Sequence, residues 1–110
     1  FRRLERRACR VLSRKPNLVL AAGGGTLLDR VNADLLHETG TVVLLDTPYE
    51  VLARRLQNDH ARPLLDRPDR DAAMLELYNA RMPLYKKHAD FAVPAPDSRT
   101  AAETLRAYFA

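Results

Sequence analysis

Arginine is the residue type through which this chain is best equipped to do chemistry. Only three of its 18 basic residues are lysines, so 15 are arginines. A guanidinium carries a planar set of hydrogen-bond donors that matches a carboxylate or a phosphate. The arginines therefore point to small anionic ligands as well as to nucleic acid, and a general compositional bias toward arginine is the alternative explanation.

Arg81 stands out because it interrupts an apolar stripe. Met74, Leu77 and Leu84 share its face of a predicted helix. A charge on such a face needs a partner. A ligand carboxylate would provide one, and the alternative is a structural carboxylate or a side chain that reaches solvent at the rim.

Arg2 raises the same question near the start of the chain, beside Phe1 and Leu4. Its simplest partner is Glu5, one helical turn away, in a pair that stabilises a helix by only a few tenths of a kcal/mol. By itself this pairing is the better explanation of Arg2.

Three successive glycines, Gly23, Gly24 and Gly25, follow the apolar run at residues 18–22. Without Cβ atoms, such a backbone passes close to a ligand and presents N–H groups to it. The run predicts a strand buried on both faces, and ligands of open α/β sheets bind beyond the carboxyl ends of the strands. The triplet is therefore a candidate ligand-binding turn, with an ordinary tight turn as the alternative.

Arg62 lies in a segment, residues 58–69, that is rich in Asp, Arg and Pro and has no periodicity. This composition predicts an exposed, mobile segment. A short apolar patch at residues 63–65 follows the arginine, as in lids that close over a substrate and bring a cation to transferring phosphoryl charge. A solvated loop without a role is the alternative.

The elements that must position these residues alternate between helices and buried strands. Apolar periodicity predicts helices at residues 1–13, in a short stretch around Leu35 and Leu36 that Gly40 closes, at 71–87 and at about 101–109. Short apolar runs predict strands at residues 18–22, 41–46 and 91–93. Thr47, Pro48 and Glu50 supply an N-cap, a first-turn proline and a capping-box acid for one more helix, which runs through Leu56. The alternation predicts an α/β fold with parallel strands and helices on both faces of the sheet.

Length and composition limit the class of protein to which this chain can belong. A chain of 110 residues with 46% hydrophobic residues and a net charge of +4 fits one globular domain. No apolar run approaches the ~20 residues of a membrane span and no leader opens the chain, so we expect a cytoplasmic protein without a membrane partner.

The lone Cys9, expected as a small core residue, fits a reducing compartment. His37, His60 and His88 have no metal-ligand spacing, so no metal site is expected, and the phosphate-loop pattern ending in Gly-Lys-Ser/Thr is absent.

Taken together, the ordered motifs resemble those of shikimate kinase. They are Phe-Arg-Arg-Leu-Glu at residues 1–5, the glycine triplet, Arg-Pro-Leu-Leu at 62–65 and Arg-Met-Pro-Leu-Tyr at 81–85. The resemblance covers residues 1–110 as a partial domain, roughly the C-terminal two thirds of the family's domain, with a lid at about 58–69. It implies a three-layer P-loop kinase fold of the nucleoside monophosphate kinase type, incomplete at the N-terminus. The implied reaction transfers the γ-phosphate of ATP to the 3-hydroxyl of shikimate in aromatic amino acid biosynthesis.

The resemblance also implies roles for individual residues. Arg2 and Arg81 would bind the shikimate carboxylate from opposite sides, with Glu5 orienting Arg2. The N–H groups of Gly23, Gly24 and Gly25 would approach shikimate. On the ATP side, Arg62 would be the catalytic lid arginine at the phosphates, Arg55 would lie against adenine, and Arg99 would belong to the other adenine-side segment, 96–99.

The phosphate loop, its lysine and the Mg2+ ligands belong to the family's N-terminal third, which this chain lacks. We therefore expect the 110 residues alone to be inactive and of doubtful stability, and the protein to act as a monomer on shikimate, ATP and Mg2+. The main alternative is a kinase-like effector-binding domain of a transcriptional regulator, and a second is another small-molecule kinase such as a gluconate kinase. Nucleic-acid binding is disfavoured because the arginines are spread along the chain without an aromatic platform.

Overall fold

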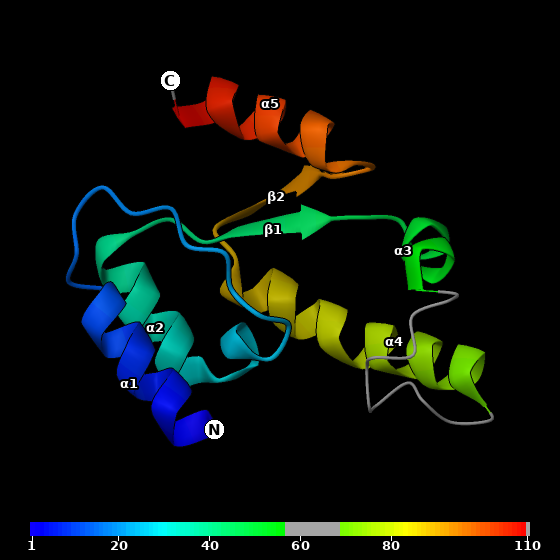
Figure 1. Ribbon diagram of the computed structural model, residues 1–110, viewed down its shortest axis with the longest axis horizontal. Helices are drawn as coiled ribbons and strands as arrows, with labels where there is room; N and C mark the ends of the chain where they lie inside the picture. The colour runs from blue at the N-terminus through cyan, green and yellow to red at the C-terminus, as the bar shows by residue number, and fades with distance from the viewer. Residues whose placement is uncertain (57–68, 110) are drawn as a thin grey trace. The chain divides into compact units, whose positions relative to one another are not determined.

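The computed structural model describes residues 1–56 and 69–109. Within them the helices and strands follow one another as α1 (Arg2–Leu12), the 3-10 helix η1 (Thr26–Leu28), α2 (Arg30–Thr39), β1 (Val43–Asp46), α3 (Tyr49–Leu56), α4 (Arg70–His88), β2 (Phe91–Pro94) and α5 (Ser98–Phe109) (Figure 1). The predicted helices are all present, and α4 continues through Pro83 as expected. Two of the three predicted strands are present as β1 and β2.

The two strands pair with each other in parallel. The Asp90 N–H donates to the Val42 carbonyl over 2.7 Å, and the Ala95 N–H donates to the Asp46 carbonyl over 3.0 Å. The partners advance in the same direction along both strands, which is the parallel register. The sheet of the described residues has the order β1-β2.

The predicted strand at residues 18–22 is wrong. The segment has no regular secondary structure, and its side chains are exposed, with Val19 99% exposed. Apolar composition favours burial, but a strand also needs a neighbour for its backbone N–H and C=O groups. In the part of the chain that the structure describes, β1 and β2 pair with each other and neither pairs with this run.

Helix α3 begins within one residue of the predicted start, but the Thr47 hydroxyl does not cap it. Thr47 is buried and its hydroxyl donates to the Ala95 carbonyl over 2.7 Å. The carbonyl of Pro48 accepts from the N–H groups of Val51 and Leu52, so the proline stands at the helix boundary. The predicted capping box at Thr47 is wrong: α3 begins at Tyr49, so Pro48 rather than Thr47 precedes its first residue, and among the described residues no N–H of the helix donates to the Thr47 hydroxyl.

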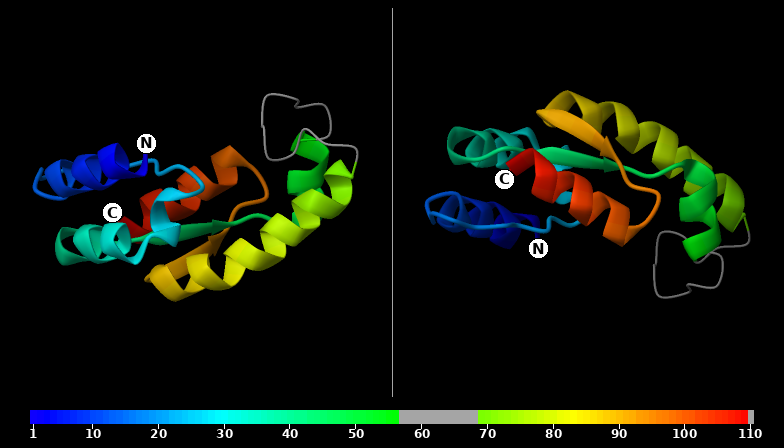
Figure 2. Two further views of the ribbon diagram at one scale, coloured as in Figure 1. Left: turned by 90° about the horizontal axis from the view of Figure 1, so that it is seen from below. Right: turned by 90° about the horizontal axis from the view of Figure 1, so that it is seen from above.

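The described residues form two compact units, Phe1–Leu44 with Leu84–Phe91 and Leu45–Pro83 with Ala92–Ala110. In the first unit α1 lies beside α2 (Figure 2), and Cys9 and Ala33 are buried. Burial of Cys9 confirms its predicted place in the core, and it raises the pKa of the thiol.

In the second unit Ala73 and Met74 of α4 form a small core. The side chains packed against it are Tyr49, Ala53, Leu56 and Leu77. Tyr49 also meets Tyr78 edge to face, with ring centroids 5.3 Å apart. None of the described helices has the length and apolar character that a bilayer crossing demands.

Candidate functional site

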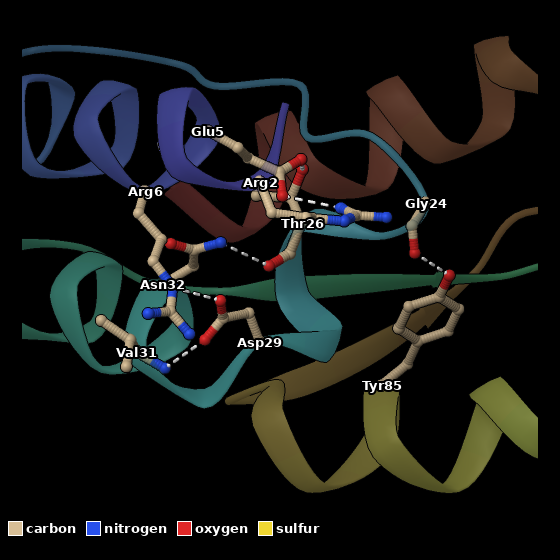
Figure 3. A network of polar contacts seen from close by, with 9 residues as sticks. All are labelled: Arg2, Glu5, Arg6, Gly24, Thr26, Asp29, Val31, Asn32 and Tyr85. Carbon is tan, nitrogen blue, oxygen red and sulfur yellow. Dashed lines mark hydrogen bonds and ion pairs between the residues drawn. The ribbon is translucent and has the colours of Figure 1, made fainter.

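An ion pair in the first turn of α1 opens the candidate site. The Arg2 guanidinium lies 2.7 Å from Glu5 Oε1, the pairing across one helical turn that the sequence made available (Figure 3). The Arg2 side chain is 58% exposed whereas that of Glu5 is 12% exposed. The hydrogen bond from Arg2 is the main reason that the pKa of Glu5 lies below its ordinary value, with a smaller contribution from Thr26. Glu5 thus holds the Arg2 guanidinium while more than half of the Arg2 side chain remains exposed.

Thr26 holds the second oxygen of the same carboxylate. Its hydroxyl donates to Glu5 Oε2 over 2.9 Å, and Thr26 itself is buried. Its carbonyl accepts from the side-chain amide of the fully buried Asn32 over 3.0 Å, which ties the site to α2. Because both oxygens of Glu5 are hydrogen-bonded and its pKa is lowered, the carboxylate is suited to orienting Arg2 rather than to accepting a proton.

The glycine triplet lies against this pair. A methyl group at Gly25 would lie 2.4 to 2.9 Å from the guanidinium atoms of Arg2, so Arg2 occupies the space of the missing side chain. No described glycine has a positive φ. Close approach rather than backbone freedom is therefore the reason for glycine at this position.

Backbone donors of the triplet are available to a ligand. Among the described residues, the N–H groups of Gly23, Gly24 and Gly25 find no acceptor. The Gly24 carbonyl instead accepts a hydrogen bond from the Tyr85 hydroxyl, which comes from the last turn of α4 (Figure 3). N–H groups without a partner, near an exposed guanidinium, suit a ligand that carries a carboxylate and further oxygens.

Arg6 and Asp29 form a second ion pair beneath the first. Arg6 Nε lies 2.6 Å from Asp29 Oδ2, and Asp29 Oδ1 accepts the Val31 N–H over 2.9 Å as the N-cap of α2. The Arg6 hydrogen bond is the main cause that lowers the pKa of Asp29. This pair fixes α1 to the start of α2 and so supports the turn between them.

The second unit holds the other sequence-predicted arginines that the structure describes. Arg81 is half-buried on α4 and forms no ion pair with any described residue, so a structural carboxylate partner is not found there. Leu84, expected on the same apolar stripe, is 39% exposed.

Arg55 and the segment that starts at Pro96 are brought together. Arg55 Nη2 donates to the Pro96 carbonyl over 2.7 Å. Asp97 then begins α5 by accepting the Thr100 N–H, which is the main cause that lowers the pKa of Asp97. Arg99 lies in the first turn of α5, is 90% exposed and is 3.4 Å from Glu103.

Arg62 and the proposed lid up to residue 68 lie outside the described residues. Within the described ranges, no three His, Cys, Asp or Glu side chains gather as metal ligands. His37 and His88, distant in sequence, do meet: the His37 ring lies 2.6 Å from the His88 carbonyl and 3.3 Å from Asp90.

Three features of the candidate site were not predicted from the sequence. Thr26 follows the glycine triplet directly, but its partner Glu5 is 21 residues away and only the fold brings them together. Tyr85 stood in a quoted motif without a role, and the close approach that requires glycine at 25 was not separated from the other two positions. The hydroxyl next to the triplet was the one available signal.

Comparisons with known proteins agree on one family. A family model described as shikimate kinase matches residues 1–108. Shikimate kinases from Neisseria gonorrhoeae and Neisseria meningitidis serogroup C are each 41% identical over 96% of this chain, which covers 78% and 62% of those proteins. The chain therefore spans about three fifths of the length of several curated relatives.

Solved structures give the same result. Shikimate kinase from Acinetobacter baumannii in complex with shikimate has a TM-score of 0.84 and 30% identity, with 99% of this chain and 63% of that chain covered. Shikimate kinase from Bacteroides thetaiotaomicron has a TM-score of 0.81 and 25% identity, with 98% of this chain and 66% of that chain covered.

Proposed function

Because this chain belongs to the shikimate kinase family and has its α/β P-loop kinase fold, we propose that it forms the larger part of an enzyme that phosphorylates shikimate. The reaction transfers the γ-phosphate of ATP to the 3-hydroxyl: a bond forms between that oxygen and phosphorus, and the bond from phosphorus to ADP breaks. Residues 1–110 are proposed to be a partial domain with a lid at about 58–69.

The observation that carries the proposal is the Arg2 guanidinium, held by Glu5 and lying over Gly25 while more than half of its side chain stays exposed. A guanidinium with free donors binds a carboxylate through charge-assisted hydrogen bonds worth about 1.5 to 3 kcal/mol each. We assign it to the carboxylate of shikimate. The free N–H groups of the glycine triplet would bind the oxygens of the same substrate, and Arg81 is assigned to the same carboxylate.

The ATP side of the proposal uses the remaining arginines. Arg55, which donates to the Pro96 carbonyl, is assigned to the adenine. Arg99, at the end of the segment 96–99, is assigned to the adenine side of ATP as well. Arg62 of the lid is assigned to the phosphates, where a cation stabilises the charge that develops during transfer. The family implies Mg2+, and none of the described residues is assigned to it, because no three His, Cys, Asp or Glu side chains gather among them.

These residues contribute position and charge rather than covalent chemistry. Holding a small polyol by its carboxylate fixes the direction in which its 3-hydroxyl points, and this converts a chance encounter into an oriented reaction. Both oxygens of Glu5 are engaged, so it is not assigned as the base that receives the hydroxyl proton.

A steady-state assay of ADP release tests the proposal on the enzyme that contains the whole chain. We expect Arg2→Ala and Arg81→Ala each to lower kcat/KM for shikimate by about 100-fold, because each leaves the carboxylate with one guanidinium fewer. Arg10→Ala removes another exposed arginine of α1 and should leave kcat/KM unchanged. Shikimate binding without any ATP-dependent phosphorylation would refute the kinase proposal and favour an effector-binding domain.

We propose in addition that the 110 residues alone do not catalyse the reaction, that the enzyme is monomeric and that it works in the cytoplasm. Among the described residues 1–56 and 69–109, the buried apolar residues are few and mostly small, and many large apolar ones are exposed, among them Phe1, Val19 and Tyr108. ATP-dependent shikimate phosphorylation by the isolated chain would contradict the first of these points.

A further inference from the structure

Thr26 is the residue at which the glycine triplet, α1 and α2 are joined. Its N–H donates to the Gly23 carbonyl over 3.2 Å, its hydroxyl donates to Glu5 Oε2 over 2.9 Å, and its carbonyl accepts from Asn32 over 3.0 Å. All of its polar groups are therefore engaged, and the residue is 8% exposed. Only the bond to Glu5 uses the side chain.

The hydroxyl decides how the Glu5 carboxylate is turned. The last torsion of a glutamate is broad and roughly two-fold, so a carboxylate with one partner can rotate. Here Oε1 faces Arg2 at 2.7 Å while Oε2 faces Thr26 at 2.9 Å. The bond to Thr26 thus fixes the plane of the group that holds Arg2.

Arg2 is held from two adjacent positions of the same turn. Gly25 provides the space under its guanidinium, and Thr26 provides the anchor for its carboxylate partner. Figure 3 shows the path from Thr26 through Glu5 to Arg2. The N–H and carbonyl bonds of Thr26 belong to the backbone, so a side-chain substitution can remove the hydroxyl while leaving them in place.

We propose that Thr26 is a positioning residue for substrate recognition: through Glu5 it holds the Arg2 guanidinium in the orientation that receives the shikimate carboxylate. This inference rests on the proposed function. Thr26 does not touch the substrate; its effect passes through two side chains whose contacts are given above.

The test compares Thr26→Val, which replaces the hydroxyl by a methyl group of similar size, with Thr26→Ser, which keeps the hydroxyl. Both are made in the enzyme that contains the whole chain. Thr39→Val is the matched control, because the Thr39 hydroxyl donates to the Ser13 carbonyl over 2.5 Å, away from Arg2. Thr26→Val should raise the KM for shikimate about 3- to 10-fold, the effect of one lost hydrogen bond, with the KM for ATP unchanged. Thr26→Ser and Thr39→Val should both keep the wild-type KM for shikimate.

A readout that needs no substrate accompanies the kinetics. Thr26 is one of the groups that lower the pKa of Glu5, so the Glu5 carboxyl of Thr26→Val should titrate at higher pH in a carbon-13 NMR titration of the free enzyme. The Thr39→Val enzyme should titrate like the wild type. If Thr26→Val does not yield folded enzyme, Thr26→Ala takes its place with the same expected results.

Two results would overturn the proposal. One is a Thr26→Val enzyme whose KM for shikimate equals that of Thr39→Val, even if its melting temperature falls; the other is a Thr26→Ser enzyme as impaired as Thr26→Val, which would assign the effect to packing of the methyl group. An impaired Arg2→Ala enzyme beside a normal Thr26→Val enzyme refutes the role of Thr26 alone. If Arg2→Ala and Thr26→Val both keep the wild-type KM for shikimate, the assignment of Arg2 is refuted and with it the proposed substrate site.

Discussion

Substituting Gly25 by alanine separates the needs of the fold from the needs of the site. Gly25 has φ −97° and ψ −13°, which alanine adopts without strain. The new methyl group would lie 2.4 Å from Arg2 Nη2, 2.7 Å from Nη1 and 2.9 Å from Cζ. Contacts of this kind require about 3.5 Å, so the guanidinium must move by roughly 1 Å.

Displacing the guanidinium should change the stability of the protein little and lower the rate of the reaction. The displaced group is the exposed end of a long side chain, and Gly to Ala at a compatible backbone conformation stabilises a fold by about 0.4 to 1 kcal/mol through the unfolded chain. Thermal unfolding should therefore show an equal or slightly higher melting temperature. A misplacement of about 1 Å in a substrate-holding group can cost up to a hundredfold in rate, so kcat/KM for shikimate should fall about 10- to 100-fold.

A double-mutant cycle with Arg2→Ala identifies the cause. If Gly25→Ala acts by displacing Arg2, it should add little to the defect of the Arg2→Ala enzyme, because the group that it displaces is already gone. Equal effects of Gly25→Ala in the wild-type and Arg2→Ala backgrounds would refute this explanation, as would an unchanged kcat/KM in the single variant.

Three further substitutions test neighbouring contacts. Tyr85→Phe removes the hydroxyl that holds the glycine turn and should raise the KM for shikimate about 3- to 10-fold; a change confined to the KM for ATP would contradict this. Asp29 has a pKa below its ordinary value, chiefly through Arg6, so its contribution to stability is present above its unfolded-state pKa and is lost as the pH falls through the lower folded-state value. Asp29→Asn should remove that part of the acid dependence of the melting temperature, and an unchanged pH profile would exclude the contribution. Arg55→Ala should raise the KM for ATP about 3- to 10-fold, as loss of a stacked cation would, whereas Arg54→Ala, an exposed neighbour, should not; equal effects would rule out the adenine assignment.

Local patterns made the helices predictable. The apolar spacing in residues 1–13 and 71–87 reflects contacts within one helix, and α1 and α4 occupy nearly those ranges. The pairing of Arg2 with Glu5 is also local, one turn apart, and the structure contains it. The roles assigned to these residues remain proposals.

Contacts between distant segments account for what could not be predicted. The run at 18–22 has the composition of a buried strand, but its state depends on a backbone partner that composition does not specify. Thr47 carries a side chain typical of helix N-caps, yet its hydroxyl donates to the Ala95 carbonyl, 48 residues away in sequence. Thr26 and Gly25 gain their importance from the side chains of α1, more than 20 residues earlier.

Carboxylate recognition by Arg2 is the centre of the proposed function, and substrate discrimination measures it directly. The ratio of kcat/KM for shikimate to that for its uncharged methyl ester should be large in the wild-type enzyme, because the ester offers the guanidinium no charge. In Arg2→Ala this ratio should fall by about tenfold or more, through a selective loss of activity on shikimate itself. An Arg2→Ala enzyme that discriminates between acid and ester as strongly as the wild type would show that Arg2 does not bind the carboxylate.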